Sequence, residues 1–169
     1  MTTTALHATT LRDILIDELM EAYDSDRQLL EAWPRLSSAA GAESLQRLCR
    51  EGVDYTRTRV GRLTQAFQAL DVPARAKACD AMTALIESAF EVCEEGPSGA
   101  VKDAALLAQI SKISHYGLAD YASLQGFAEA FGESAVAKLM AESHHEKEEA
   151  VREEAKMAED EINPAATRT

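Results

Sequence analysis

The segment from Val101 to Leu124, VKDAALLAQISKISHYGLADYASL, constrains the fold more than any other part of the chain. It contains no proline, and inward-facing residues recur at helical spacing through it and beyond its end: Leu106, Ile110, Ile113, Gly117, Tyr121, Leu124, then Phe127 or Ala128, and Phe131. This spacing predicts one amphipathic helix of about thirty residues, roughly 45 Å long. Because such a helix is not stable alone in water, it needs partners of similar length, and the chain should form a long-helix bundle.

Four other segments show the same periodicity. Thr10 and Asp13 together are typical of a helix start, Ser44 is a plausible N-cap, and Asn163-Pro164 is expected to end the last helix. The expected helices span residues 10–40, 44–70, 77–95, 101–131 and 135–160.

The predicted fold class is all-α, with no strand periodicity anywhere. The connection between the second and third long helices holds the short helix and is long enough to cross the bundle. One such crossover is typical of the ferritin-like four-helix arrangement, here with an extra short helix between helices 2 and 3. We expect a single domain over residues 10–161, with flexible tails at residues 1–9 and 162–169.

The acidic composition excludes some classes of partner. The chain has 29 acidic and 17 basic residues and a net charge of −12, which argues against nucleic acid and against anionic membrane surfaces. No apolar run is long enough for a membrane span, and the N-terminal residues do not resemble a secretory signal. Cys49, Cys79 and Cys93 have no CxxC spacing, so we expect reduced thiols and a cytoplasmic protein.

Candidate metal ligands are few. Glu142-Ser-His-His145 matches the Glu-x-x-His spacing used by di-metal bundles, but Glu142 lies off the inward stripe, so a solvated helix face is the alternative. His115 is either a packing residue or a ligand. No nucleophile, base and orienting residue can be assembled, and no catalytic residue is assigned.

Two charged residues stand on inward-facing stripes. Asp26 is the only acid squarely on the stripe of the first helix, and Arg59 stands on the apolar face of the second. A buried acid must be neutralised, paired or bound to metal, so we predict a buried Asp26–Arg59 pair. Lys147 would add a second positive charge if it turns inward. The alternative is that Arg59 extends to water.

Several segments resemble a known family between Leu11 and Pro164. They are DELMEAYDSDRQLLEAWPRL, the end of the second helix from Thr56 to Leu63, KACDAMTALIE, VKDAALLAQISKISHYGLADYASL and AEDEINP. On these segments the chain is similar to the YciE/YciF-like bacterial stress proteins of the ferritin-like superfamily. The resemblance implies a dimeric, cytoplasmic, stress-linked bundle with a carboxylate-rich di-metal site for iron or manganese.

That implied site is altered at most positions in this chain. The family's first-helix Glu corresponds to Asp26, and its third-helix Glu-His-Tyr-Glu pattern reads Ser114-His115-Tyr116-Gly117. The remaining family-equivalent positions are Asp54, Tyr55, Arg59, Glu146 and Lys147. Secondary metal candidates are His115, Glu142 and His145.

We therefore expect a non-enzymatic, stress-associated or partner-binding protein without a cofactor, in which charged residues replace the metal centre. The alternative is a ferritin-like metalloprotein with a shifted iron or manganese site that uses Asp26, Asp54, Glu146 and His115. A third interpretation is an adaptor that uses the bundle as a scaffold. The short helix 77–95 and the Trp33–Pro34 region offer apolar surface, which favours a homodimer.

Overall fold

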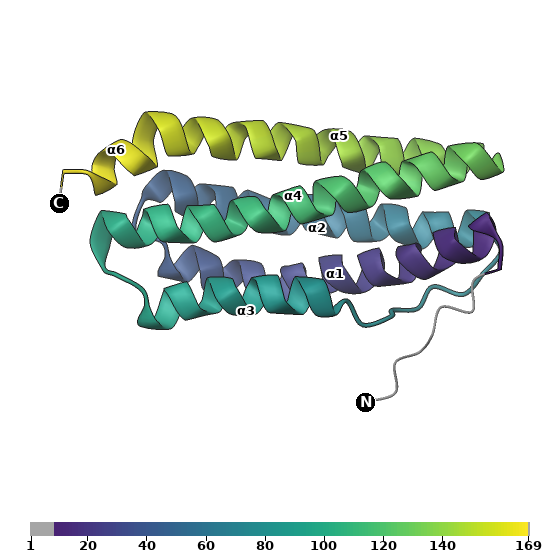
Figure 1. The fold of residues 1–169 in the computed structure, drawn as a ribbon, viewed down its shortest axis with the longest axis horizontal. Coiled ribbons are helices and arrows are strands. Elements are labelled where there is room, and N and C mark those ends of the chain that lie inside the picture. Colours follow the sequence, from purple (N-terminus) through teal and green to yellow (C-terminus); the bar gives the residue numbers. More distant parts are fainter. Residues whose placement is uncertain (1–8, 169) are drawn as a thin grey trace.

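The chain folds into a bundle of long helices in a computed structural model that describes residues 9–168 (Figure 1). The elements are α1 (Leu11–Ala39), α2 (Glu43–Ala69), α3 (Asp80–Glu95), α4 (Gly99–Phe131), α5 (Ser134–Met157), a π-helical turn (Ala158–Ile162) and α6 (Asn163–Ala166). No strand occurs among the described residues, and the all-α prediction is confirmed. No helix in this part of the chain is long and apolar enough to cross a membrane.

The long crossover is also confirmed. After α2 the chain runs as an extended segment and then as α3, which lies along α1 and α4 and returns over much of the bundle's length before α4 begins (Figure 1). The backbone N–H of Lys77 donates to the carbonyl of Met20 and ties the extended segment to α1. Because the crossover restores the direction, α2 and α4 run the same way (Figure 1). The most extensive helix pairs are α1 with α2 and α4 with α5, and α1 also packs on α4 and α2 on α5.

The helix ends follow the sequence signals only in part. Thr10 forms the expected capping box with Asp13, and Gly132 ends α4 in the left-handed conformation, with φ 89°. Ser44, however, is not the N-cap of α2, because the helix begins at Glu43 with Ala42 as its N-cap. The Ser44 hydroxyl donates to Glu161. The N–H groups of Gly41 and Ala42 donate to the two carboxylate oxygens of Asp103, at 2.7 and 2.8 Å.

The end of the chain differs from the prediction as well. The expected stop at Asn163-Pro164 is wrong, because the π-helical turn leads directly into α6. Proline is tolerated in the first turn of a helix, where its missing N–H would have no partner. Ile162 is buried in the core, so the helical path continues past residue 161, where the bundle was expected to end. The expected N-terminal tail, apart from Thr9, lies outside the described residues.

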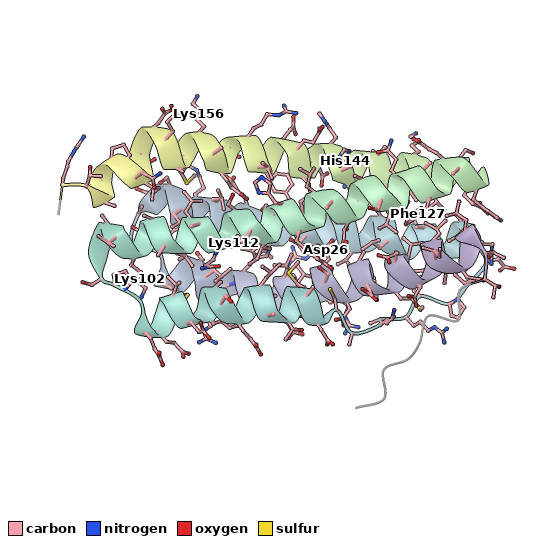
Figure 2. The ribbon with its side chains drawn as sticks, in the orientation of Figure 1. Asp26, Lys102, Lys112, Phe127, His144 and Lys156 are labelled. Atoms are coloured by element: carbon pink, nitrogen blue, oxygen red, sulfur yellow. The ribbon has the colours of Figure 1, made fainter. Side chains whose placement is uncertain are left out.

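The core consists of two apolar clusters. One contains Leu29, Trp33, Leu36, Cys49, Met82, Ile110 and Ile113, among others. The other contains Leu15, Leu19, Leu63, Phe67, Leu124 and Met140, among others. Along α1 and α2, the buried charged residues Asp26 and Arg59 lie between the residues of the two clusters. Asp26 lies near the middle of the bundle (Figure 2).

The apolar surface on which the homodimer prediction depended is mostly used inside the chain. Trp33 is 4% exposed, and the buried side of α3, with Met82, Ile86 and Ala89, packs into the first cluster. The large apolar side chains described as exposed are Tyr55, Val101 and Phe131, which belong to different helices or helix ends.

Candidate functional site

The predicted Asp26–Arg59 pair is confirmed. Both side chains are about 4% exposed, and Arg59 Nε and Nη2 lie 3.2 and 3.4 Å from the two carboxylate oxygens of Asp26. Tyr121 donates its hydroxyl to the same carboxylate at 2.5 Å. Burial and the Asp26 charge raise the pKa of Tyr121 well above its usual value, so the hydroxyl keeps its proton and remains a donor.

A second set of contacts fixes the Arg59 guanidinium. Its Nη2 donates to the Thr56 hydroxyl at 2.8 Å, and Trp33 donates its indole N–H to the same oxygen at 2.9 Å. The indole can reach this position because residue 52 is glycine: a Cβ there would lie 2.8 Å from Trp33 Cε2. Trp33 of α1 and Thr56 of α2 therefore position Arg59, which faces Asp26.

Lys147 of α5 brings a second positive charge into the bundle. Its side chain is buried and passes over Gly117 of α4, where a Cβ would lie 2.9 Å from Lys147 Cε and 3.2 Å from Nζ. Burial, with the nearby Arg59 charge, lowers the pKa of Lys147 to about 8. A side chain at position 117 and the observed position of Lys147 compete for the same space.

Glu154 completes the group that we call the ionic cluster, namely Asp26, Arg59, Lys147 and Glu154. Ser114 donates its hydroxyl to Glu154 Oε1 at 2.6 Å, whereas Oε2 is buried without a hydrogen-bond partner. Burial raises the pKa of Glu154 to about 7, although Ser114 and Lys147 both favour its charged form. The cluster thus draws one charged residue from α1, one from α2 and two from α5.

Most of the other sequence candidates lie outside this cluster. The Asp54 side chain is 82% exposed and pairs with Arg57, and Tyr55 is 55% exposed. Glu146 faces Arg62, whose Nη2 lies 2.6 Å from its Oε1. Asp54 and Glu146 were expected near the level of Asp26. Asp54 instead pairs with the exposed Arg57, whereas Glu146 lies in the same pocket lining as Arg59 but pairs with the half-buried Arg62.

The histidine candidates are exposed. His115 Nδ1 lies 2.8 Å from the carbonyl oxygen of Ser111 in its own helix. His145 is 65% exposed, near Glu148 and Glu149, while Glu142 approaches Arg62. Within residues 9–168, no group of three or more His, Cys, Asp or Glu side chains could hold a metal ion.

The donor set does not fit the di-metal site that the resemblance implies. Where the resemblance implies two third-helix carboxylates, this chain has Ser114 and Gly117, and the space beside Gly117 is filled by the Lys147 side chain. Two buried cations, Arg59 and Lys147, would repel a divalent ion at the same place.

The sequence did not reveal every member of the site. Tyr121 was expected on the inward stripe of the long helix and Ser114 at a family-equivalent metal position, but neither was given a role toward Asp26 or Glu154, and Thr56 was given no role. Glu154 was missed altogether because it lies in a run dominated by exposed acids. Its position seven residues after Lys147 was the available signal, since that spacing returns to the same helix face.

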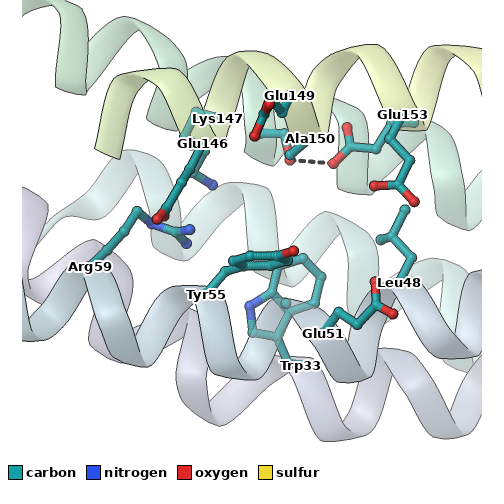
Figure 3. Close-up of a pocket in the computed structure, with 13 residues that line it drawn as sticks. Trp33, Leu48, Glu51, Tyr55, Arg59, Glu146, Lys147, Glu149, Ala150 and Glu153 are labelled. Atoms are coloured by element: carbon teal, nitrogen blue, oxygen red, sulfur yellow. Dashed lines mark hydrogen bonds between the residues drawn. The ribbon is translucent and has the colours of Figure 1, made fainter. Parts of the chain in front are cut away.

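A pocket of about 270 Å³ opens beside the cluster, between α2 and α5 (Figure 3). Arg59, Lys147, Ser114, Glu154 and Trp33, which are all buried, line the pocket. Exposed residues of α2 and α5 surround its mouth: Glu51, Tyr55, Glu149 and Glu153.

Comparisons with known proteins agree on one family. The family model described as Domain of unknown function (DUF892) matches residues 10–167. Protein YciF of Escherichia coli (strain K12) is 33% identical over 138 residues, covering 81% of this chain and 83% of YciF. The crystal structure of the E. coli stress protein YciF matches with a TM-score of 0.89 and 30% identity, over 92% of this chain and 99% of that one.

A second solved structure shows the same fold. It is YcfI, described as a putative structural protein from Rhodopseudomonas palustris, with a TM-score of 0.85 and 24% identity. The match covers 92% of this chain and 98% of YcfI.

Proposed function

Because the chain belongs to the family described as Domain of unknown function (DUF892), we propose that it is a stress-associated structural protein whose bundle works without a bound metal. The ionic cluster takes the position that the di-metal centre would have. The link to stress rests on the similarity to YciF, which is described as a stress protein. No catalytic residue is part of the proposal.

The position of Lys147 carries the proposal. Its side chain occupies the space beside Gly117, where the resemblance places a carboxylate ligand, and it brings a positive charge instead. The Asp26–Arg59 pair, with its Tyr121 hydrogen bond, satisfies the remaining first-helix carboxylate without an ion. The alternative, a shifted metal site, lacks support because its four residues do not meet at one place: Asp54 and His115 are exposed.

Metal analysis of protein without a His-tag tests the proposal. We expect inductively coupled plasma mass spectrometry to find substoichiometric iron and manganese, even after incubation with either ion and gel filtration. The matched control is His144→Ala with His145→Ala, which removes the half-buried and the exposed imidazole that can bind metal adventitiously. A content near two ions per chain that persists in this control would contradict the proposal.

We also propose that the protein is a homodimer in the cytoplasm and offers its acidic surface to a protein partner. The dimer is supported by the family resemblance rather than by a large exposed apolar face. The cytoplasm is supported by Cys49, Cys79 and Cys93, which are all free. Light scattering at micromolar concentration should give twice the chain mass of 18.3 kDa, and a monomer mass would exclude the dimer. Cell fractionation tests the compartment.

A further inference from the structure

The pocket beside the ionic cluster is larger than a water site needs. Its volume of about 270 Å³ compares with roughly 30 Å³ for one water molecule. It is close to the lower limit for small-molecule sites, roughly 300 Å³. The pocket can therefore hold a molecule the size of an amino acid.

The buried end of the pocket presents a cation that makes no hydrogen bond or close ion pair with the described residues. Lys147 is 3% exposed, and no hydrogen bond or ion pair to its Nζ occurs among residues 9–168. Arg59 lies next to it, and only its Nε and Nη2 are used by Asp26 and Thr56. A buried ammonium without a partner is costly, so this end favours an anionic group such as a carboxylate.

The same pocket is also lined by carboxylates with oxygens that accept no hydrogen bond. Glu154 is 3% exposed, and neither its Oε2 nor that of Glu146 has a hydrogen-bond partner. Three exposed glutamates, Glu51, Glu149 and Glu153, surround the mouth. These carboxylates favour a ligand group that donates hydrogen bonds and carries positive charge, such as an ammonium.

We propose that the pocket binds a small aliphatic zwitterion of the amino-acid class, with its carboxylate on Lys147 and Arg59 and an ammonium on Glu154. A simple anion would meet the repulsion of five glutamates, and a simple cation would meet Lys147. Trp33 and Tyr55 provide aromatic surface for the methylene chain (Figure 3). This binding is independent of the proposed structural role.

Four molecules of similar length separate the two charge requirements. L-norleucine and L-lysine carry both a carboxylate and an α-ammonium, hexanoate carries only the carboxylate, and 1,5-diaminopentane carries only ammonium groups. Calorimetric titration of the full chain should show that the two amino acids bind at least about tenfold more tightly than the other two. Equal binding of hexanoate or the diamine would overturn the proposal. The proposal would also be overturned if neither amino acid gave a heat of binding at a ligand concentration of about 10 mM, roughly ten times a Kd of about 1 mM.

Matched variants test the residues. Lys147→Met should weaken binding of the amino acids at least about tenfold, whereas Lys138→Met, at an exposed position of the same helix, should leave it unchanged. Ala150→Phe changes no charge but fills the pocket, so it should abolish binding even if Lys147→Met fails to fold. Unchanged binding in a folded Lys147→Met or Ala150→Phe variant would overturn the proposal.

Discussion

Arg59 and Leu63 lie one helical turn apart on the buried face of α2, but different forces hold them. Leu63 belongs to the apolar cluster with Phe67 and Leu124, and its own side chain can make only packing contacts there. Arg59 belongs to the ionic cluster and depends on Asp26 and Thr56 for compensation of its charge and hydrogen bonds. Substitutions at Leu63 should therefore act through lost volume, and substitutions at Arg59 through the charge that they leave unpaired.

The largest effect is expected from Arg59→Met. Removing one partner of a buried pair leaves the Asp26 carboxylate uncompensated, so the free energy of unfolding should fall by about 3–5 kcal/mol. Adding Asp26→Asn should recover part of that loss, since the stranded charge is gone. Urea denaturation of both variants measures this, and a neutral Arg59→Met would contradict our account of the cluster.

Leu63→Ala provides the apolar counterpart. We expect a loss of about 2–5 kcal/mol from the removed methyl groups and the remaining cavity. Asp26→Asn should add its own effect to this loss and give no rescue. If Asp26→Asn rescued Leu63→Ala as well, the two regions would not be energetically distinct.

The ionic cluster should also make stability depend on pH. Burial raises the pKa of Glu154 from 4.5 to about 7, so the folded state binds the proton more tightly than the unfolded state. This contribution is fully present below pH 4.5 and is lost as pH rises through about 7, and we expect it to reach about 1–3 kcal/mol. Comparing urea denaturation of wild type and Glu154→Gln across this range measures it. If the free energy of unfolding changed with pH in the same way in both proteins, the raised pKa of Glu154 would be contradicted.

A smaller effect is expected where Trp33 positions Arg59 through Thr56. Gly52→Ala puts a Cβ within 2.8 Å of the rigid indole, and we expect a loss of about 1–3 kcal/mol. Gly61→Ala in the same helix has no atom within 4 Å of the added Cβ, and it should gain about 0.5–1 kcal/mol from helix propensity. The sign difference in thermal unfolding is the readout, and equal effects would show that the indole can move freely.

Sequence patterns revealed the bundle and the Asp26–Arg59 pair for the same reason. Helical periodicity marks the buried face, and a charge on that face must be compensated within reach. Whether Lys147 turns inward could not be decided this way, because it depends on the free space beside Gly117 of another helix. Glu154 was hidden for a similar reason, since its burial depends on Ser114 and not on the acidic residues around it in the sequence.

The Asp103 carboxylate joins the turn between α1 and α2 to α4, which lies more than sixty residues further along the chain. The α1–α2 hairpin alone therefore cannot form the hydrogen bonds of the Gly41 and Ala42 N–H groups, which need Asp103 of α4. Protection of these two amides against exchange thus reports when α4 packs against the hairpin. In pulsed hydrogen exchange during refolding, the Gly41 and Ala42 amides should gain protection together with α4, and later than amides in the middle of α1. The turn thus reports the docking of the second half of the chain onto the first.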